Sequence, residues 1–182
     1  TDYLNRRFGS VNINHAQNNP LQPDVNFRGF SASPLLGLPQ GLAVYQNGVR
    51  INEPFGDTIN WDLIPWSAVN AVQLLAGAQP VFGLNTLGGA LSLDMKTGFD
   101  YEGAGAEVYA GSYGRRGAAM QYGGNSRGWG YYGSVDYFQE DGWRDYSKSD
   151  ALRLYGALTR RTENTNLDLS FAYAETELRG NG

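Results

Sequence analysis

The segment 52–62 holds the densest group of side chains that could do chemistry. Its members are three carboxylates and two large aromatic groups: Glu53, Asp57, Asp62, Phe55 and Trp61. A mixture of polar and aromatic groups is typical of a surface that binds a ligand. Two other interpretations stay open. In one, the carboxylates are solvated loop charges and Trp61 belongs to the core; in the other they form an acidic calcium site, although the spacing of an EF-hand loop is absent.

Catalytic residues are harder to find. The chain has no Cys and a single His, so a thiol nucleophile, a Cys-based zinc site and a His-rich metal site are excluded. The carboxylate pairs Glu140–Asp141 and Asp57–Asp62 are poor candidates, because adjacent residues on a strand point to opposite faces and neither pair comes with a scaffold that forms a cleft. No nucleophile stands with a base at a suitable spacing. We therefore expect a protein that is not an enzyme, with no catalytic residue, no metal site and no cofactor.

Charge and composition exclude further classes. The 182 residues carry 14 basic and 18 acidic side chains, a net charge of −4, whereas a nucleic-acid partner needs a concentrated basic face. No run approaches the roughly 18 apolar residues of a transmembrane helix. Transmembrane β-strands stay possible, because each needs only about ten residues of alternating polarity. The 25 Gly, about 14% of the chain and roughly twice average usage, disfavour a helical fold.

The elements that must position these groups change character near Gly98. The first part, 1–98, has nine aromatic residues, and the second, 99–182, has fifteen, ten of them Tyr. Before Gly98 we predict short strands separated by Pro, Asn and Gly loops, at 11–14, 25–28, 42–46, 49–52, 72–75 and 90–95. Asn47-Gly48 predicts a tight hairpin, because both positions of a type I′ turn need positive φ. The only helical stretches expected are short, at 4–8 and 65–69.

The second part predicts an antiparallel meander of five longer strands, at 102–111, 117–124, 129–139, 151–161 and 166–177. Each strand alternates in polarity, so that two faces separate. One face is expected to carry Leu152, Leu154, Leu158, Leu167, Leu169 and Phe171. The other is expected to carry Arg153, Tyr155, Asp168 and Ser170.

Such a meander fits either a half-buried soluble sheet or the wall of a membrane barrel. Aromatic residues gather near the strand ends, as the interfacial girdles of a barrel require: Tyr113, Tyr122, Trp129, Tyr131, Trp143 and Tyr146. The strands also exceed the soluble mode of about five or six residues. Both features favour the barrel.

Four blocks of the first part stand in a fixed order over about seventy residues: VNFRGF at 25–30, VYQNGVR at 44–50, IP with SAV at 64–69, and Gly77 with VFGLNTLGGAL at 81–91. Together they resemble the plug domain of TonB-dependent outer-membrane receptors. The Tyr-rich strands that follow are similar to the start of that family's barrel. The resemblance covers nearly the whole chain.

The resemblance implies a mainly β fold: a small mixed α+β plug at 1–98, lacking its N-terminal part, followed at 99–182 by the first strands of a transmembrane β-barrel. It implies a receptor in the bacterial outer membrane that takes up a scarce ligand by energy-coupled transport, with the plug gating the barrel. Iron chelates, cobalamin, sugars and peptides are all ligands of this architecture. The implied partners are the imported ligand, a TonB-type energy-transducing protein in the periplasm and the lipid bilayer, with no nucleic acid.

The alternative is a soluble β-rich carbohydrate-binding or adhesion module, whose exposed Tyr and Trp would stack on sugars. The family's barrel has about 22 strands, whereas the 84 residues after Gly98 provide about five. Five strands cannot close, and an open edge is not tolerated in hydrocarbon. We therefore expect this chain to be part of a larger receptor.

In the family, the apical loops of the plug contact the ligand, and two stretches match those positions, 31–40 and 52–62. Chain direction places both at the end opposite Asn47-Gly48. The expected ligand-binding residues are Arg28, Ser31, Ser33, Asn52, Glu53, Phe55 and Asp57, with Arg28 just beneath the others. Two other interpretations of Arg28 stay open: it could be a surface charge, or it could belong to an ion pair inside the plug.

Overall fold

The computed structural model describes residues 8–15, 19–78, 80–83, 85–142 and 147–179. Contacts divide the chain into two compact units. The first is formed by Thr1–Trp61 and Ala71–Asp94, and the second by Asp62–Asn70 and Met95–Gly182. The short segment 62–70 is therefore grouped with the strands that follow residue 95. The predicted helical stretch at 4–8 lies almost wholly outside the described residues.

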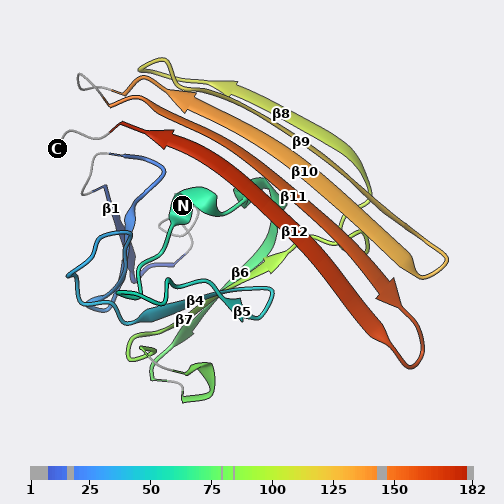
Figure 1. Ribbon diagram of the computed structural model, residues 1–182, viewed down its shortest axis with the longest axis horizontal. Coiled ribbons are helices and arrows are strands. Elements are labelled where there is room, and N and C mark those ends of the chain that lie inside the picture. Colours follow the sequence, from blue (N-terminus) through green and yellow to red (C-terminus); the bar gives the residue numbers. More distant parts are fainter. Residues whose placement is uncertain (1–7, 16–18, 79, 84, 143–146, 180–182) are drawn as a thin grey trace. The chain divides into compact units, whose positions relative to one another are not determined.

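The first unit contains two small sheets (Figure 1). One is the antiparallel meander β1 (Val11–Asn14), β2 (Asp24–Phe27) and β3 (Phe30–Ala32). The other has the order β5-β4-β7-β6, in which β4 (Leu42–Gln46) runs parallel to β7 (Gly89–Met95). Its remaining strands are β5 (Val49–Arg50) and β6 (Val69–Ala76), whose first two residues belong to the second unit.

Two tight turns with positive φ fix where strands end and begin in this unit. Asn47 and Gly48 have φ of 49° and 77° and join β4 to β5 directly, which confirms the predicted hairpin. Arg28 and Gly29, with φ of 50° and 87°, make a second such turn between β2 and β3. The strand predicted at 25–28 therefore ends at Phe27. The three-residue β3 was missed because it is too short to show alternation.

The core of the first unit comes from both sheets and from the loop that ends at Trp61. Its fully or almost fully buried apolar side chains include Val25, Phe27, Leu42, Val44, Ile59, Trp61, Leu91 and Leu93. Helical structure within the described ranges is limited to 3₁₀ turns: η1 (Trp61–Leu63), η2 (Trp66–Ala68) and η3 (Pro80–Phe82). The helical stretch predicted at 65–69 is realised as η2.

The second unit is built on one antiparallel sheet with the order β12-β11-β10-β9-β8. The strands are β8 (Gly103–Ala110), β9 (Arg116–Ser126), β10 (Trp129–Glu140), β11 (Ser149–Arg161) and β12 (Asn166–Leu178). Consecutive strands are neighbours throughout, so the predicted five-stranded meander is confirmed. None of the helical segments described has the length and apolar character needed to cross a membrane.

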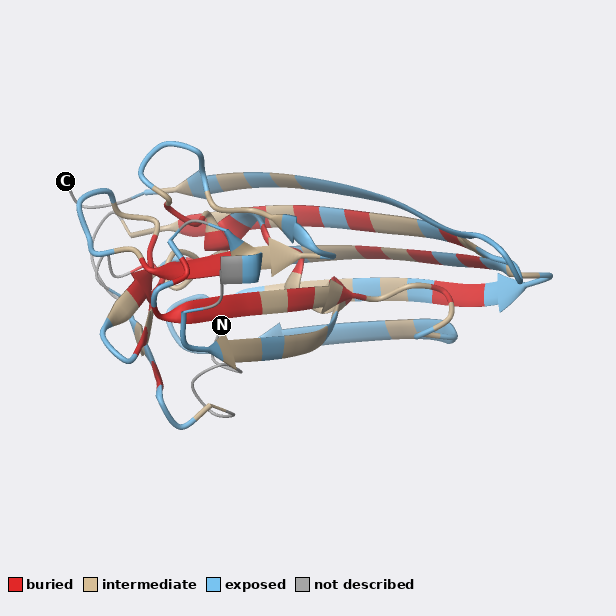
Figure 2. Ribbon diagram, turned by 90° about the horizontal axis from the view of Figure 1, so that it is seen from below, coloured by how far each residue is buried: buried red, intermediate tan, exposed pale blue. Residues whose placement is uncertain are grey.

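The two faces of this sheet differ sharply. On the inner face, Tyr132 and Tyr155 are buried against Ala68 of segment 62–70 and against Met95. On the outer face, Leu158 pairs with Leu169 and both are exposed, as are Leu154 and Phe171. The register confirms the predicted separation into two faces. Figure 2 shows buried residues alternating with intermediate or exposed ones along the middle strands of this sheet, as the patterns of β10 and β11 record.

Aromatic side chains gather at the strand ends on the outer face. Tyr122 and Tyr131 stack with ring centroids 6.0 Å apart, next to the exposed Trp129 at the β9–β10 turn. Tyr137 lies toward the opposite end of β10 and is also exposed. Trp143 and Tyr146, predicted as girdle residues, lie outside the described residues.

Candidate ligand-binding site

The loops 31–40 and 52–62 lie side by side in the first unit. The Ile59 amide donates to the Ser33 carbonyl at 3.0 Å, and the Glu53 amide closes its own loop on the Thr58 carbonyl at 2.8 Å. Loop 52–62 follows β5, which leaves the Asn47-Gly48 turn, and Ser31 and Gln40, which bound loop 31–40, form a parallel bridge with each other. Their neighbourhood, predicted from chain direction, is confirmed.

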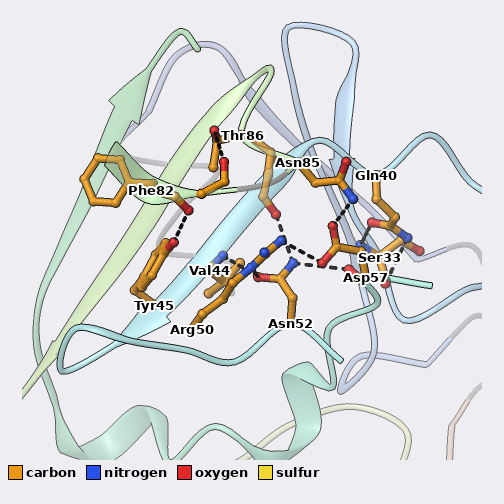
Figure 3. Close-up of polar contacts among 12 residues, drawn as sticks. Ser33, Gln40, Val44, Tyr45, Arg50, Asn52, Asp57, Phe82, Asn85 and Thr86 are labelled. Carbon is orange, nitrogen blue, oxygen red and sulfur yellow. Dashed lines mark hydrogen bonds and ion pairs between the residues drawn. The ribbon is translucent and has the colours of Figure 1, made fainter. Parts of the chain in front are cut away.

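Asp57 lies at the centre of the polar contacts in this loop pair (Figure 3). Its Oδ1 accepts from Arg50 Nη2 at 2.7 Å, and its Oδ2 accepts from the Asn85 side-chain amide. The Asp57 side chain is 16% exposed. Gly56 and Asp57 both have positive φ, 76° and 58°, which turns the carboxylate back toward Arg50. The loop is thus held in one conformation by a charge-assisted pair.

Asn52 uses both atoms of its side-chain amide inside the fold. Oδ1 accepts from the Val44 amide at 2.8 Å and from Arg50 Nε at 3.3 Å. Nδ2 donates to the carbonyls of Leu42 and Asp57, each at 3.2 Å. Asn52 therefore fastens the loop to strand β4, and its polar groups are already occupied.

Ser31 and Ser33 are turned into the fold. The Ser31 hydroxyl donates to Asn26 Oδ1 at 2.7 Å, and the Ser33 hydroxyl donates to Asp24 Oδ1. Ser33 is fully buried, and Gln40 bonds both its amide and its carbonyl. These two hydroxyls shape the loop 31–40.

The groups of the site that face outward are fewer. Phe55 is 79% exposed, and Leu36, whose side chain packs over Gly56, is 60% exposed. Glu53, two residues before Phe55 in the same loop, is also exposed and accepts from Asn60 Nδ2 at 2.8 Å. The exposed side chains of Leu36, Glu53 and Phe55 are therefore the accessible part of this site.

The described contacts of Arg28 do not include the residues of this loop pair. It lies at the β2–β3 turn, so β3 separates it along the chain from Ser33, and its guanidinium carbon sits 5.1 Å from the centroid of the Phe27 ring. The described ion pairs do not include Arg28. Arg28 is exposed at this turn, as a surface charge would be, and its contact with a ligand stays a prediction.

The remaining residues of 52–62 are structural. Trp61 is fully buried and its indole Nε1 donates to the Ala32 carbonyl at 3.2 Å, so it is a core residue. Asp62 belongs to the second unit, where its carboxylate accepts from the Thr176 hydroxyl at 2.8 Å. Across the described ranges no three His or carboxylate side chains gather into a metal-binding group.

Three partners of the site were not predicted: Arg50, Asn85 and Gln40. Arg50 ends the block 44–50 and Asn85 lies in the block 81–91, so both belong to the blocks on which the family resemblance rests. No sequence pattern indicated Gln40, because its hydrogen bonds to Ser33 depend on how the loop 31–40 folds. The sequence predicted where the loops lie. It did not show which of their polar side chains form hydrogen bonds within the fold.

Comparison with known proteins gives consistent results. A family model described as the TonB-dependent Receptor Plug Domain matches residues 1–90. No curated protein matches the sequence. Among solved structures, the pyoverdine outer membrane receptor FpvA from Pseudomonas aeruginosa PAO1 is similar, with a TM-score of 0.71 and 17% identity over 92% of this chain and 24% of its own.

Two further structures show the same fold. For the copper transporter OprC the TM-score is 0.75, with 17% identity over 94% of this chain and 27% of that one. For the ferric yersiniabactin uptake receptor FyuA from Yersinia pestis the TM-score is 0.61, with 20% identity over 96% of this chain and 28% of that one. The chain thus spans about a quarter of the length of these proteins. By its plug domain and the antiparallel strands that follow, the chain belongs to the TonB-dependent receptors.

Proposed function

We propose that the protein is an outer-membrane receptor for energy-coupled uptake of a scarce ligand, in which the plug gates the barrel. The chain described here supplies the plug and the first strands of the barrel wall. A TonB-type protein in the periplasm provides the energy, and the imported ligand and the bilayer are its other partners. No step of this role requires covalent chemistry.

The observation that carries this proposal is the polarity of the five-stranded sheet. Its inner face buries charged groups, including Arg153 and Asp136, whereas its outer face exposes Leu154, Leu169 and Phe171. A soluble sheet places its apolar face against the core. A barrel wall does the reverse, because lipid surrounds it and its lumen is polar. The alternative of a soluble sugar-binding module gains no support from this arrangement.

The ligand contact is assigned, within the proposal, to the accessible part of the loop pair. Phe55, Leu36 and Glu53 provide two apolar side chains and one carboxylate, which suit a ligand that combines apolar and hydrogen-bonding groups. Asn52, Asp57, Ser31 and Ser33 hold these loops in position. Contact of Arg28 with the ligand stays a prediction.

The proposal is tested in the complete receptor that contains this chain. Cells expressing it are fractionated, and growth is measured with ferric chelates, cobalamin, oligosaccharides or peptides as the limiting nutrient. We expect the receptor in the outer-membrane fraction, and growth on one ligand class that is lost when the host lacks its TonB-type protein. A receptor found in the soluble fraction, or growth independent of energy coupling, would overturn the proposal.

A further inference from the structure

The outer face of the five-stranded sheet carries an apolar groove of about 840 Å³. Two glycines, Gly133 and Gly156, are paired in register and form its floor. Tyr122 on one side and Phe171 on the other are the outer-face neighbours of this pair, so their side chains stand as its walls. The groove lies wholly within the second unit and runs across strands β8 to β12.

Two arginines, Arg127 and Arg160, lie at one end of this face, where Glu102 and Glu163 are also found. Arg160 lies two outward-facing positions beyond Gly156 on β11, about 13 Å away at the rise of a strand. Its guanidinium carbon is 5.1 Å from the centroid of the Trp129 ring, and Nη1 donates to the carbonyl of Arg127. Within the described residues, no ion pair contains Arg127 or Arg160.

The short joints at this end of the sheet indicate that it lies on the periplasmic side of the bilayer. The joints here are short, the two-residue turn Arg127-Gly128 and residues 162–165, whereas the joints at the other end span residues 111–115 and 141–148. Barrels place short turns in the periplasm. Half of a hydrocarbon core is about 15 Å thick. With Arg160 and Trp129 at the interface, Gly156 therefore lies inside the same leaflet.

We propose that this groove is a binding site for an anionic phospholipid of the periplasmic leaflet. Its phosphate bonds the guanidinium groups of Arg160 and Arg127, and one acyl chain lies over Gly156 and Gly133 between Tyr122 and Phe171. The site rests on the outer-membrane location proposed above and adds a specific lipid to it. Arginine suits this role because its planar donors match phosphate oxygens in pairs.

Charge complementarity selects this occupant. An apolar groove alone would accept any chain, but two arginines that form no ion pair in the described part of the chain favour a negative headgroup. Trp129 stacks under Arg160 and keeps the guanidinium at the level of the headgroups, where Trp is itself favoured. A zwitterionic phospholipid also has a phosphate, but its headgroup cation offsets that charge and is repelled by the two guanidinium groups, so it should bind more weakly.

The test uses the complete receptor, purified in detergent and examined by native mass spectrometry with added phosphatidylglycerol or with phosphatidylcholine of the same acyl chains. We expect phosphatidylglycerol to be retained at least fivefold better. The double substitution Arg127→Gln/Arg160→Gln should abolish this preference. Arg116→Gln is the matched control, because Arg116 is an exposed arginine at the other end of the same sheet and bonds Gln139.

A second variant tests the groove itself. A Cβ added at Gly156 would meet no atom closer than 3.9 Å, so Gly156→Leu fills the groove without forcing the backbone to move. It should lower phosphatidylglycerol retention at least fivefold, and Gly133→Leu should do the same. Heat-modifiable mobility on gels verifies that each variant is folded.

Three results would overturn the lipid site: equal retention of both lipids, retention unchanged in the double variant, or a stable receptor dimer that Gly156→Leu dissociates while no lipid is bound. Membrane fractionation of the same samples distinguishes failure of the lipid site from failure of the proposed function. A receptor that reaches the outer membrane but shows no lipid preference refutes only the lipid site. A receptor absent from that membrane refutes the proposed function.

Discussion

Arg153 and Asp136 form an ion pair of 2.8 Å between strands β11 and β10, with side chains only 6% and 13% exposed. Arg153 Nε also donates to the Asp62 carbonyl at 2.6 Å, and Asp136 accepts from the Ser67 hydroxyl at 3.0 Å. The pair therefore fixes segment 62–70 on the inner face of the sheet. This explains why these nine residues group with the strands rather than with their neighbours in sequence.

The first prediction concerns this pair. Arg153→Met in the complete receptor should lower the free energy of unfolding by about 3–5 kcal/mol, because it leaves the Asp136 carboxylate buried without its cation. Urea titration of the receptor in detergent measures the change. Arg179→Met is the control: its pair with Glu177 is 59% and 66% exposed, so at most about 1 kcal/mol is expected. Equal effects would show that the inner pair is solvated.

The sequence predicted most of the second unit correctly because every strand there has one polar and one apolar face, which makes alternation a strong signal. It could not reveal that segment 62–70 packs on those strands. That grouping depends on contacts between Asp62 and Thr176, far apart in the chain. The boundary at Gly98 between plug and barrel stays a prediction.

The second prediction concerns the outer face. Leu154→Arg or Leu169→Arg should each cost about 2–4 kcal/mol if the site lies near the bilayer midplane, since a charge there enters hydrocarbon. Refolding titrations into lipid vesicles measure this cost. Ser170→Arg provides the comparison, because Ser170 pairs with Ala157 on the inner face and should tolerate the change. Near-zero costs at both leucines would reject lipid contact on this face.

The candidate site was harder to predict than the fold. Phe55 and Asn52 are three residues apart in one loop and look equally suited to ligand contact, yet one is exposed and the other bonds the backbone of β4. The difference arises from the turn at Gly56 and Asp57, where both residues have positive φ. Only the folded loop shows which polar groups are left over for a ligand.

The third prediction separates these two roles. Phe55→Ala should weaken binding of the ligand identified by the growth panel about tenfold or more, while the free energy of unfolding stays within about 0.5 kcal/mol, as for other surface positions. Asn52→Ala should instead cost about 1–3 kcal/mol of stability, because buried partners lose their hydrogen bonds. Equilibrium binding and urea titration of both variants provide the measurements. Unchanged binding in Phe55→Ala would remove this loop from the site.

The last prediction concerns Gly98, where the composition of the chain changes. A Cβ at this position would lie no more than 2.5 Å from three backbone atoms, one of Gly124 and two of Tyr131. Strand backbone cannot yield as a flexible side chain does, so Gly98→Ala should cost about 3 kcal/mol, at the upper end for an over-packed site. Gly133→Ala is the matched control, because its nearest atom is 3.9 Å away and the loss of glycine freedom in the unfolded chain favours folding slightly. Both variants are compared with the parent by urea titration of the complete receptor. Equal stability of the two would show that residue 98 is not packed against β9 and β10.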